Sequence, residues 1–236
     1  MALGGGNFTA QNKVLPGSYI NFVAASRASS VLSDRGIVAM PLVMSWGPEG
    51  EVFEVTKDEF KKNSKLIFGY ENTTNEMLVI RELFLNASKA LFFRLGKGAT
   101  YSENKYAKAR YPGVRGNSIS ISISKNNDND KTYDVKTLLD SIVVDVQKAV
   151  STIADLKENS FVKWKQGVTL TVEANIPLVG GTNASKTDNY SEFLNKIESY
   201  SFNILTVENE SANTLFENFT KSMREDKGVK FQTVLY

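Results

Sequence analysis

The order of hydrophobic and polar residues changes character twice along the chain. In its first and last parts, short apolar runs suited to buried strands alternate with stretches whose apolar residues recur every three to four positions, as in amphipathic helices. This rhythm predicts strands at 19–23, 37–43, 51–55, 90–95, 202–207 and 229–236, and helices at 57–66, 75–86, 188–200 and 212–226. Strands that alternate with helices are typical of an α/β layer structure.

Local signals refine several of these elements. Thr56 and Glu59 have the spacing of a capping box, which predicts that a helix begins at Lys57. Pro41 interrupts the run 37–43 and predicts an edge position or a bulge, because proline cannot donate to a sheet ladder. The residues expected on the inward faces of the later helices are Met77, Ile80, Leu83 and Phe84, then Tyr190, Phe193, Leu194 and Ile197, and finally Leu215, Phe216, Phe219 and Met223.

The middle of the chain has a strand-like pattern instead. Residues 118–124 alternate strictly between serine and isoleucine, which predicts a strand with one buried and one solvated face. A hairpin turn is predicted at 126–130, a short helical turn at 152–157, and further strands at 133–139, 142–146, 161–164 and 168–174. Several short strands separated by turns favour a small sandwich or barrel.

The two patterns together predict one domain inserted into another. We expect an α/β (α+β) host domain formed by residues 17–96 and 182–236, with a mainly-β, sandwich- or barrel-like domain at 97–181 inserted into it. Glycines at 96, 98, 180 and 181 suit two close crossings of the chain at the joints.

The two ends of the chain carry separate predictions. Residues 1–16 form no core element, and their scattered apolar residues predict a flexible, extended N-terminal arm rather than a frayed polar tail. The strand-like pattern runs up to Tyr236, which suggests that the natural protein continues beyond it.

Composition excludes several kinds of chemistry. The 236 residues are 42% hydrophobic and 23% charged, as in ordinary globular proteins, but they include neither Cys nor His. Ser-His-Asp and Cys-His catalysis are therefore excluded, and so is a Cys/His zinc site. The 28 basic and 26 acidic residues give a net charge of +2, which is too even for a dedicated nucleic-acid or membrane-surface binder. The longest apolar run, 37–44, is far shorter than the ~20 residues of a membrane helix.

Three groups of residues resemble chemical sites without completing one. The glycine-rich segment 96–100 lacks the spacing of a phosphate loop. Asp128, Asp130 and Asp134 lack the glycine and the terminal glutamate of a calcium loop. Glu76 and Glu82 are six residues apart on a predicted helix and do not face one another. We therefore predict no catalytic residue, no cofactor and no metal site, and no enzymatic activity.

Basic and aromatic residues interleave at the start of the predicted insertion. The cluster comprises Lys97, Lys105, Lys108, Arg110 and Arg115 with Tyr101, Tyr106 and Tyr111. Such a pattern is compatible with single-stranded nucleic acid. The near-neutral chain as a whole favours a solvated face or a protein contact instead. An alternative function is a surface- or carbohydrate-binding β-module, which would need the aromatic residues of 101–111 to be exposed together.

Seven short segments carry a resemblance to a known family. They are MALGGGNFT and NKVLPGSYINF within 1–22, SDRGIVAMPL at 33–42, WGPEG at 46–50, ARYPGVRGN at 109–117, PLVGGT at 177–182 and GVKFQ at 228–232. These segments resemble the contractile tail sheath proteins of phages, of the simple PBSX-like type found in Gram-positive prophages, myophages and phage-tail-like bacteriocins. The resemblance spans the whole chain, and the combination is more specific than any one segment.

The resemblance implies a structural protein of a phage or phage-tail-like particle, assembled in the bacterial cytoplasm. Its partners would be other sheath subunits, a tail tube protein and a baseplate, with no nucleic acid and no membrane insertion. The sheath would contract to drive the tube through the target surface. Full-length relatives carry a C-terminal domain that is expected to be absent here, so the chain would be a largely monomeric, assembly-defective fragment.

The resemblance also suggests which residues take part in assembly. The arm and its root would contribute interactions through strand exchange between neighbours. The interaction residues predicted there are Leu3, Phe8, Val14, Leu15, Tyr19 and Phe22. A turn of the inserted domain would be shaped by Tyr111, Pro112, Gly113, Arg115 and Gly116, without any assigned chemistry.

Overall fold

A computed structural model describes residues 36–235 of the chain. The predicted arm at 1–16 and the predicted strand at 19–23 lie outside the described residues.

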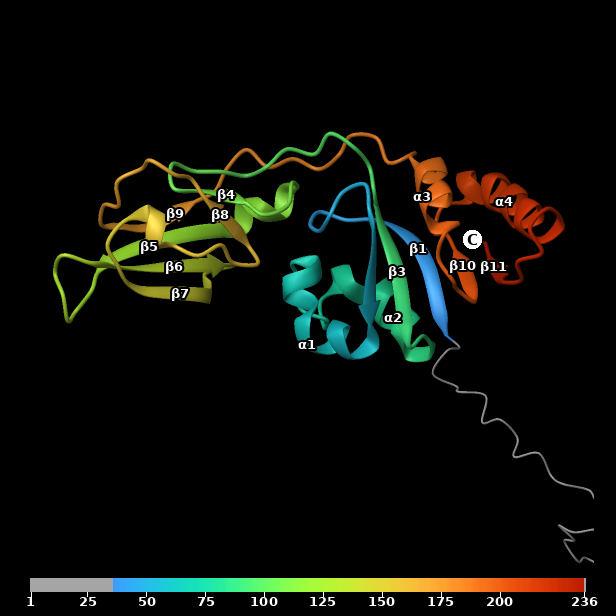
Figure 1. Cartoon of the computed structure of the whole chain (residues 1–236), viewed down its shortest axis with the longest axis horizontal. Helices are drawn as coiled ribbons and strands as arrows, with labels where there is room; N and C mark the ends of the chain where they lie inside the picture. The colour runs from blue at the N-terminus through green and yellow to red at the C-terminus, as the bar shows by residue number, and fades with distance from the viewer. Residues whose placement is uncertain (1–35, 236) are drawn as a thin grey trace, which may run out of the picture. The chain divides into compact units, whose positions relative to one another are not determined.

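The first and last parts of the described chain build one five-stranded sheet (Figure 1). Its strands are β1 (Ile37–Val43), β2 (Val52–Thr56), β3 (Lys89–Leu95), β10 (Ile204–Thr206) and β11 (Gln232–Val234). Their spatial order is β11-β10-β1-β3-β2, and all neighbouring pairs are parallel except β2 with β3. Segments more than a hundred residues apart in the sequence therefore share one sheet.

Helices cover both faces of this sheet. One face carries α1 (Lys57–Phe68) and α2 (Leu78–Asn86), which follows the short 3₁₀ helix η2 (Asn75–Met77). The other face carries α3 (Tyr190–Ile197) and α4 (Asn213–Glu225), which follows η5 (Glu210–Ala212). The predicted capping box is confirmed, because the Thr56 side chain accepts from the Glu59 N–H while the Glu59 carboxylate accepts from the Thr56 N–H.

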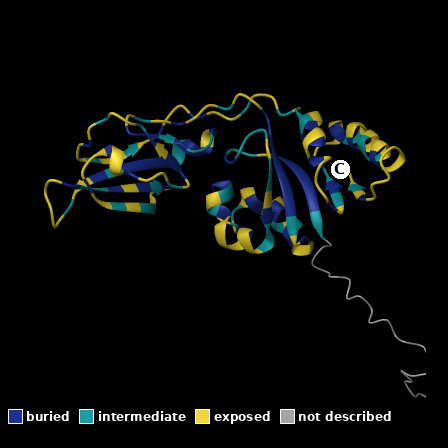
Figure 2. Ribbon diagram, in the orientation of Figure 1, coloured by how far each residue is buried: buried dark blue, intermediate teal, exposed yellow. Residues whose placement is uncertain are grey.

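Alternate residues of the central strands enter two separate cores. In β3, Ala90 and Phe92 pack against α1 and α2, whereas Leu91 and Phe93 pack towards α3 and α4. Figure 2 shows β1 and β3 almost entirely buried, as near-continuous apolar runs in a parallel sheet should be.

The prediction that Pro41 marks an edge strand or a bulge is wrong. Strand β1 is the middle strand of the sheet, and its pairing with β3 runs from Ile37 to Val43 without a register shift. The short strand β10 pairs only with Val38 and Ala39, so Pro41 lies beyond the end of that ladder. A central strand tolerates proline here because one neighbouring strand stops before reaching it.

The middle of the chain forms a separate β-rich body. Four antiparallel strands lie in the order β7-β6-β5-β9, namely β7 (Ile142–Val150), β6 (Tyr133–Leu139), β5 (Ile119–Lys125) and β9 (Glu173–Pro177). A second, two-stranded sheet pairs β4 (Ala107–Ala109) with β8 (Val162–Trp164). The short 3₁₀ helices η3 (Val114–Ser118) and η4 (Ile153–Asp155) complete the body. The isoleucines of β5 are all buried, as predicted.

Some predictions for individual residues and strands are wrong. The strand predicted at 168–174 lies at β9, a few residues later, and β4 was not predicted. Ser120 is buried rather than solvated, because its hydroxyl donates to Asn175 in β9 at 2.6 Å. Leu215 is exposed, since in the first turn of α4 only its neighbour Phe216 reaches the core. The overall class, an α/β sheet combined with a mainly-β body, is confirmed.

Candidate functional site

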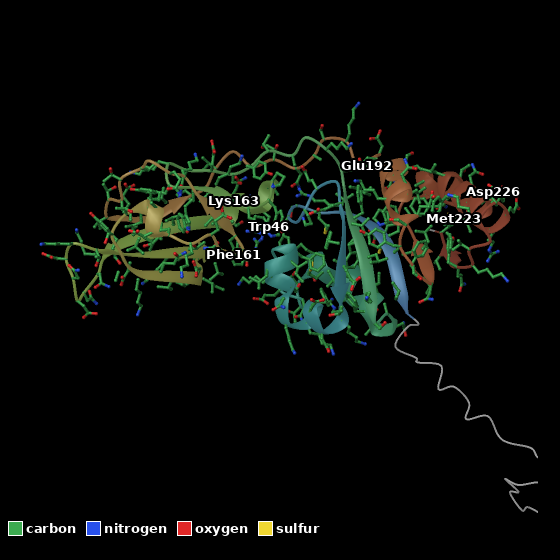
Figure 3. All side chains as sticks on the ribbon, in the orientation of Figure 1. Trp46, Phe161, Lys163, Glu192, Met223 and Asp226 are labelled. Atoms are coloured by element: carbon green, nitrogen blue, oxygen red, sulfur yellow. The ribbon has the colours of Figure 1, made fainter. Side chains whose placement is uncertain are left out.

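The loop that follows β1 inserts a tryptophan into the core of the β-rich body. Trp46 is 1% exposed and belongs to the same buried cluster as the isoleucines of β5, although β1, the strand before its loop, belongs to the five-stranded sheet. Its ring meets Tyr111 edge-on at 5.4 Å between ring centroids. The centroid of the Phe161 ring lies 6.3 Å from that of Trp46, and both residues are labelled in Figure 3. Such aromatic contacts stabilise a fold by more than the burial of their apolar area alone. Trp46 therefore joins two bodies, the α/β body built on the five-stranded sheet and the β-rich body.

Arg94 of β3 connects the α/β body with the β-rich body by donating hydrogen bonds to backbone carbonyl groups of both. The side chain is 1% exposed, and its Nη1 donates to the carbonyls of Gly47 and Pro112, each at 2.8 Å. Its Nε donates to the carbonyl of Met44 at 3.0 Å. Burial lowers the pKa of Arg94, and the Glu49 carboxylate, 4.0 Å from Nη2, opposes that shift. The guanidinium group stays charged, because arginine does not lose its proton in proteins.

Arg115 makes a second connection of the same kind. Its Nε donates to the carbonyl of Gly69 at 2.8 Å, just after α1, and its guanidinium group lies 4.3 Å from the ring centre of Tyr70. The two Nη atoms donate to both carboxylate oxygens of Asp140, at 2.9 and 2.5 Å. This fork geometry is specific to arginine and fixes the orientation of the side chain.

Glycine is required where the turn at 111–116 meets the loop after β1. Gly113 has a φ of 132°, and a Cβ there would lie 2.1 Å from the carbonyl oxygen of Ser45. A Cβ on Gly116 would lie 2.5 Å from the hydroxyl oxygen of Ser102. These glycines permit close packing of the turn against Ser45 and Ser102.

The two chain segments that connect the bodies pair with each other. Thr100 and Thr182 exchange backbone hydrogen bonds, and Glu103 pairs with Val179 in the same antiparallel sense. Asn117 holds Gly181 from both sides, donating to its carbonyl and accepting from its N–H, each at 2.9 Å. A Cβ on Gly181 would lie 2.1 Å from Ser102 Oγ, so the glycine permits a close crossing.

These contacts define a junction between the five-stranded sheet and the β-rich body. We call it the sheet–body junction. Its members are Trp46, Arg94, Arg115, Gly113, Gly181 and the paired segments 97–103 and 179–186. The predicted turn residues Tyr111, Pro112, Gly113, Arg115 and Gly116 all lie at or beside this junction. Their role in shaping a turn of an inserted domain stays a prediction.

Sequence reasoning missed the two central members of the junction, Trp46 and Arg94. A signal for Arg94 was present, because an arginine within the apolar run KALFFRL must find partners for its charge. Trp46 had no comparable signal, since a tryptophan in a Gly- and Pro-rich loop can equally lie at a surface.

The basic and aromatic residues at 97–115 do not form one exposed platform. Tyr106 is fully buried in the β-rich core, and its hydroxyl donates to Glu173 at 2.7 Å. Tyr111 packs against Trp46, whereas Tyr101 is 40% exposed and has the Lys108 ammonium group 4.0 Å from its ring centre. The exposed aromatic cluster required by a carbohydrate-binding module is therefore not present in the described residues.

The β-rich body carries one strongly perturbed carboxylate. Glu173 Oε1 accepts from the Lys105 ammonium group, from Thr171 at 2.6 Å and from Tyr106, and these hydrogen bonds lower its pKa to about 2. All the donors stabilise the charged form. The group lies in a surface network rather than in a cleft with a second carboxylate.

Residues 36–235, the part that the structure describes, hold neither a cluster of metal ligands nor a membrane-spanning helix. There is no group of three or more Asp and Glu side chains there that could hold a metal ion. None of the helices in that part of the chain is long and apolar enough to cross a membrane.

Comparison with known proteins identifies the family. Residues 87–183 match the β-sandwich domain of phage tail sheath proteins, and residues 35–95 match the N-terminal region of domain III of the tail sheath protein Gp18. The chain is 30% identical to the phage-like element PBSX protein XkdK and 31% identical to the uncharacterized protein YqbK, both from Bacillus subtilis (strain 168). These alignments cover 98% and 99% of the chain but 55% of each relative.

Solved structures agree with this result. A sheath tail protein from Desulfitobacterium hafniense matches with 31% identity and a TM-score of 0.77, over 93% of this chain and 52% of that protein. A sheath tail protein from Listeria innocua matches with 30% identity and a TM-score of 0.72, over 85% and 47%. The chain thus spans about half the length of the relatives it matches.

The fold class is an α/β body with a mostly parallel sheet, joined to a β-sandwich body. The chain belongs to the phage tail sheath protein family, because the two family models together span residues 35–183 and the similarity extends over nearly the whole chain. Proteins of this family are structural, which confirms the prediction that the chain is not an enzyme.

Proposed function

We propose that the chain is part of a sheath subunit that polymerises helically around a tail tube and contracts to drive the tube through the target surface. The observation that supports this most directly is the match with the Desulfitobacterium hafniense sheath tail protein over 93% of the chain. The similarity to a protein of the phage-like element PBSX supports a prophage or bacteriocin particle as its setting, with assembly in the bacterial cytoplasm.

The proposed partners are other sheath subunits, a tail tube protein and a baseplate. In the assembled sheath, residues 1–16 act as an arm that adds a strand to a neighbouring subunit. The arm and its root supply side-chain contacts through Leu3, Phe8, Val14, Leu15, Tyr19 and Phe22. Strand addition provides affinity through backbone hydrogen bonds and register through alternate side chains. The region 97–181 acts as a domain inserted between host segments 17–96 and 182–236, and the sheet–body junction holds it in place.

Immunogold electron microscopy tests the structural role. Antibodies raised against this chain are applied to phage-tail-like particles from the bacterium that encodes it. We expect gold label along the length of the tail and none with pre-immune serum. Label confined to the tail tip, or absent from tails altogether, would contradict a sheath subunit.

Hydrogen exchange tests the arm. Each backbone residue that becomes ordered loses ~1–2 kcal/mol of conformational entropy, so the arm should become ordered only when a neighbour provides a strand edge. We expect the amides of residues 2–14 to exchange rapidly in the isolated chain. The isolated chain should also sediment as a monomer, and negative-stain microscopy should show no long tubes. Strong protection of these amides in the monomer would be evidence against arm exchange.

A further inference from the structure

Among residues 36–235, no helix covers part of one face of the five-stranded sheet. Over β1 and β3, α1 and α2 cover one face, and α3 covers the other together with α4. Parallel sheets normally have both faces covered along their whole width. Strands β10 and β11 extend the sheet beyond β1, and α4 covers them on one side only.

The α2 side of these two strands carries two apolar side chains that are at least partly accessible, beside the polar Thr206. Thr233 faces α4, because its hydroxyl group is 2.7 Å from that of Thr220, so its neighbour Val234 points to the α2 side and is 46% exposed. In β10, Leu205 is buried against α3 and α4, whereas Ile204 packs from the other side beside α1 and α2 and is only partly buried. The uncovered area therefore continues the apolar core of the α2 side.

A hollow of about 420 Å³ lies over this area, between α2 and β11. Its apolar lining comes mainly from Val38, Met40, Val79, Leu83, Ile204 and Val234. Val79 also lines a second hollow of about 340 Å³ at the carboxyl end of β1, so the two adjoin along α2. We call the two together the α2 trough.

The charged residues of the α2 trough all have the same sign. Glu82 lines the first hollow, and Glu76 and Glu208 line the second. Among the described residues, neither lining includes a Lys or an Arg. An occupant with basic side chains beside its apolar surface would be complementary to this rim.

We propose that the α2 trough binds an amphipathic α-helix of a partner polypeptide, with an apolar stripe flanked by Lys or Arg. The trough lies on the face of the sheet, in the layer of α2, where a helix rather than an added strand fits. Such a helix places apolar residues at spacings of three and four on Val79, Ile204 and Val234, while its basic residues reach Glu76, Glu82 and Glu208. The proposal does not depend on tube formation or on the arm.

Titration of the full chain with model helices tests the proposal. The probe is a fluorescein-labelled 18-residue peptide of Leu and Lys with one apolar face, followed by fluorescence anisotropy. One control peptide has Glu in place of every Lys, and another has the same Leu and Lys residues in an order without an apolar face. We expect the Leu/Lys helix to bind at least tenfold more tightly than either control, and its affinity to fall at least threefold in 0.5 M salt.

Two substitutions on the same helix locate the binding surface. Val79→Lys places a charge in the α2 trough, whereas Leu85→Lys changes another exposed apolar residue of α2 that does not line it. We expect Val79→Lys to weaken binding at least tenfold, Glu82→Lys to weaken it at least threefold, and Leu85→Lys to change it less than twofold. Circular dichroism confirms that each variant is folded.

Several results would overturn the proposal. One is binding of the Glu peptide or of the reordered peptide as tight as that of the Leu/Lys helix. Another is an unchanged affinity in Val79→Lys. A third is concentration-dependent self-association that Val79→Lys abolishes, which would make a second copy the occupant. Binding that occurs only after deletion of residues 1–35 would show instead that the chain fills the trough itself.

Discussion

At the scale of single residues, the sheet–body junction depends on backbone groups that meet at short range. Arg94 donates to carbonyls of two bodies from a fully buried position, and Gly113 lets its backbone approach that of Ser45. Neither property follows from residue type alone, because an arginine in a strand or a glycine in a turn has many possible partners. Each depends on which segment the fold places opposite.

Substitution of Gly113 by Ala should destabilise the chain by about 3–5 kcal/mol. The added Cβ would meet the Ser45 carbonyl at 2.1 Å, in a backbone conformation that also disfavours a side chain. Urea unfolding followed by tryptophan fluorescence measures the change. Gly98→Ala is the matched control, because Gly98 also has a positive φ but nothing lies near its Cβ position, so it should cost only about 1 kcal/mol. Equal losses in the two variants would mean that the close approach does not exist.

Glu173 should make the β-rich body sensitive to acid. Its folded pKa of about 2 lies below the ordinary value of 4.5, so the stabilisation is complete above pH 4.5 and is lost as the pH falls through 2. Because the group is exposed, solvent screening keeps the effect small. Thermal unfolding between pH 2 and pH 6 should show a shallower dependence on pH in Glu173→Gln than in the unchanged chain. Parallel curves would rule out this carboxylate as a contributor.

At the scale of elements, local signals predicted helices better than strands. The Thr56 and Glu59 pair placed the start of α1 at the correct residue, since a capping box is completed within four residues. Strand β9 was predicted several residues too early, because its pairing is decided by β5, more than fifty residues away. The partner in β8 likewise decides that the three residues of β4 form a strand.

Removal of the helix cap gives a prediction at this scale. Thr56→Ala should cost about 1 kcal/mol, because it leaves the Glu59 N–H without its side-chain acceptor. Thr74→Ala is the control, since Thr74 stands at the same position before η2 but its side chain makes no capping hydrogen bond, and we expect less than about 0.5 kcal/mol. Chemical denaturation of both variants measures the difference, and a Thr74→Ala loss as large as that of Thr56→Ala would argue against the cap.

At the scale of the whole molecule, the described part of the chain consists of two bodies joined by a few buried groups. The hydrophobic cores of the five-stranded sheet are separate from that of the β-rich body, and Trp46 is the large side chain that crosses from one to the other. This arrangement suggests that the two bodies unfold together only while the junction is intact.

Substitution of Trp46 by Ala tests this coupling. Loss of a fully buried indole ring should cost about 3–5 kcal/mol. It should also change one calorimetric unfolding transition into two, because each body then unfolds separately. Phe60→Ala, in the core between α1 and the sheet, is the control that should lower the midpoint and keep a single transition. A single transition in Trp46→Ala would show that Arg94, Arg115 and the paired connectors couple the bodies without Trp46.

The sequence alone determined the kinds of elements, the α/β and β-rich halves, the absence of Cys and His chemistry and the resemblance to tail sheath proteins. These depend on periodicity, composition and short motifs, which are local properties of the chain. Only the tertiary structure decided that β1 is central despite Pro41, that Trp46 and Arg94 join the bodies, and that no described helix covers one face of β10 and β11. The physical reason is that burial and pairing between residues far apart depend on which segments meet, and no local pattern specifies that.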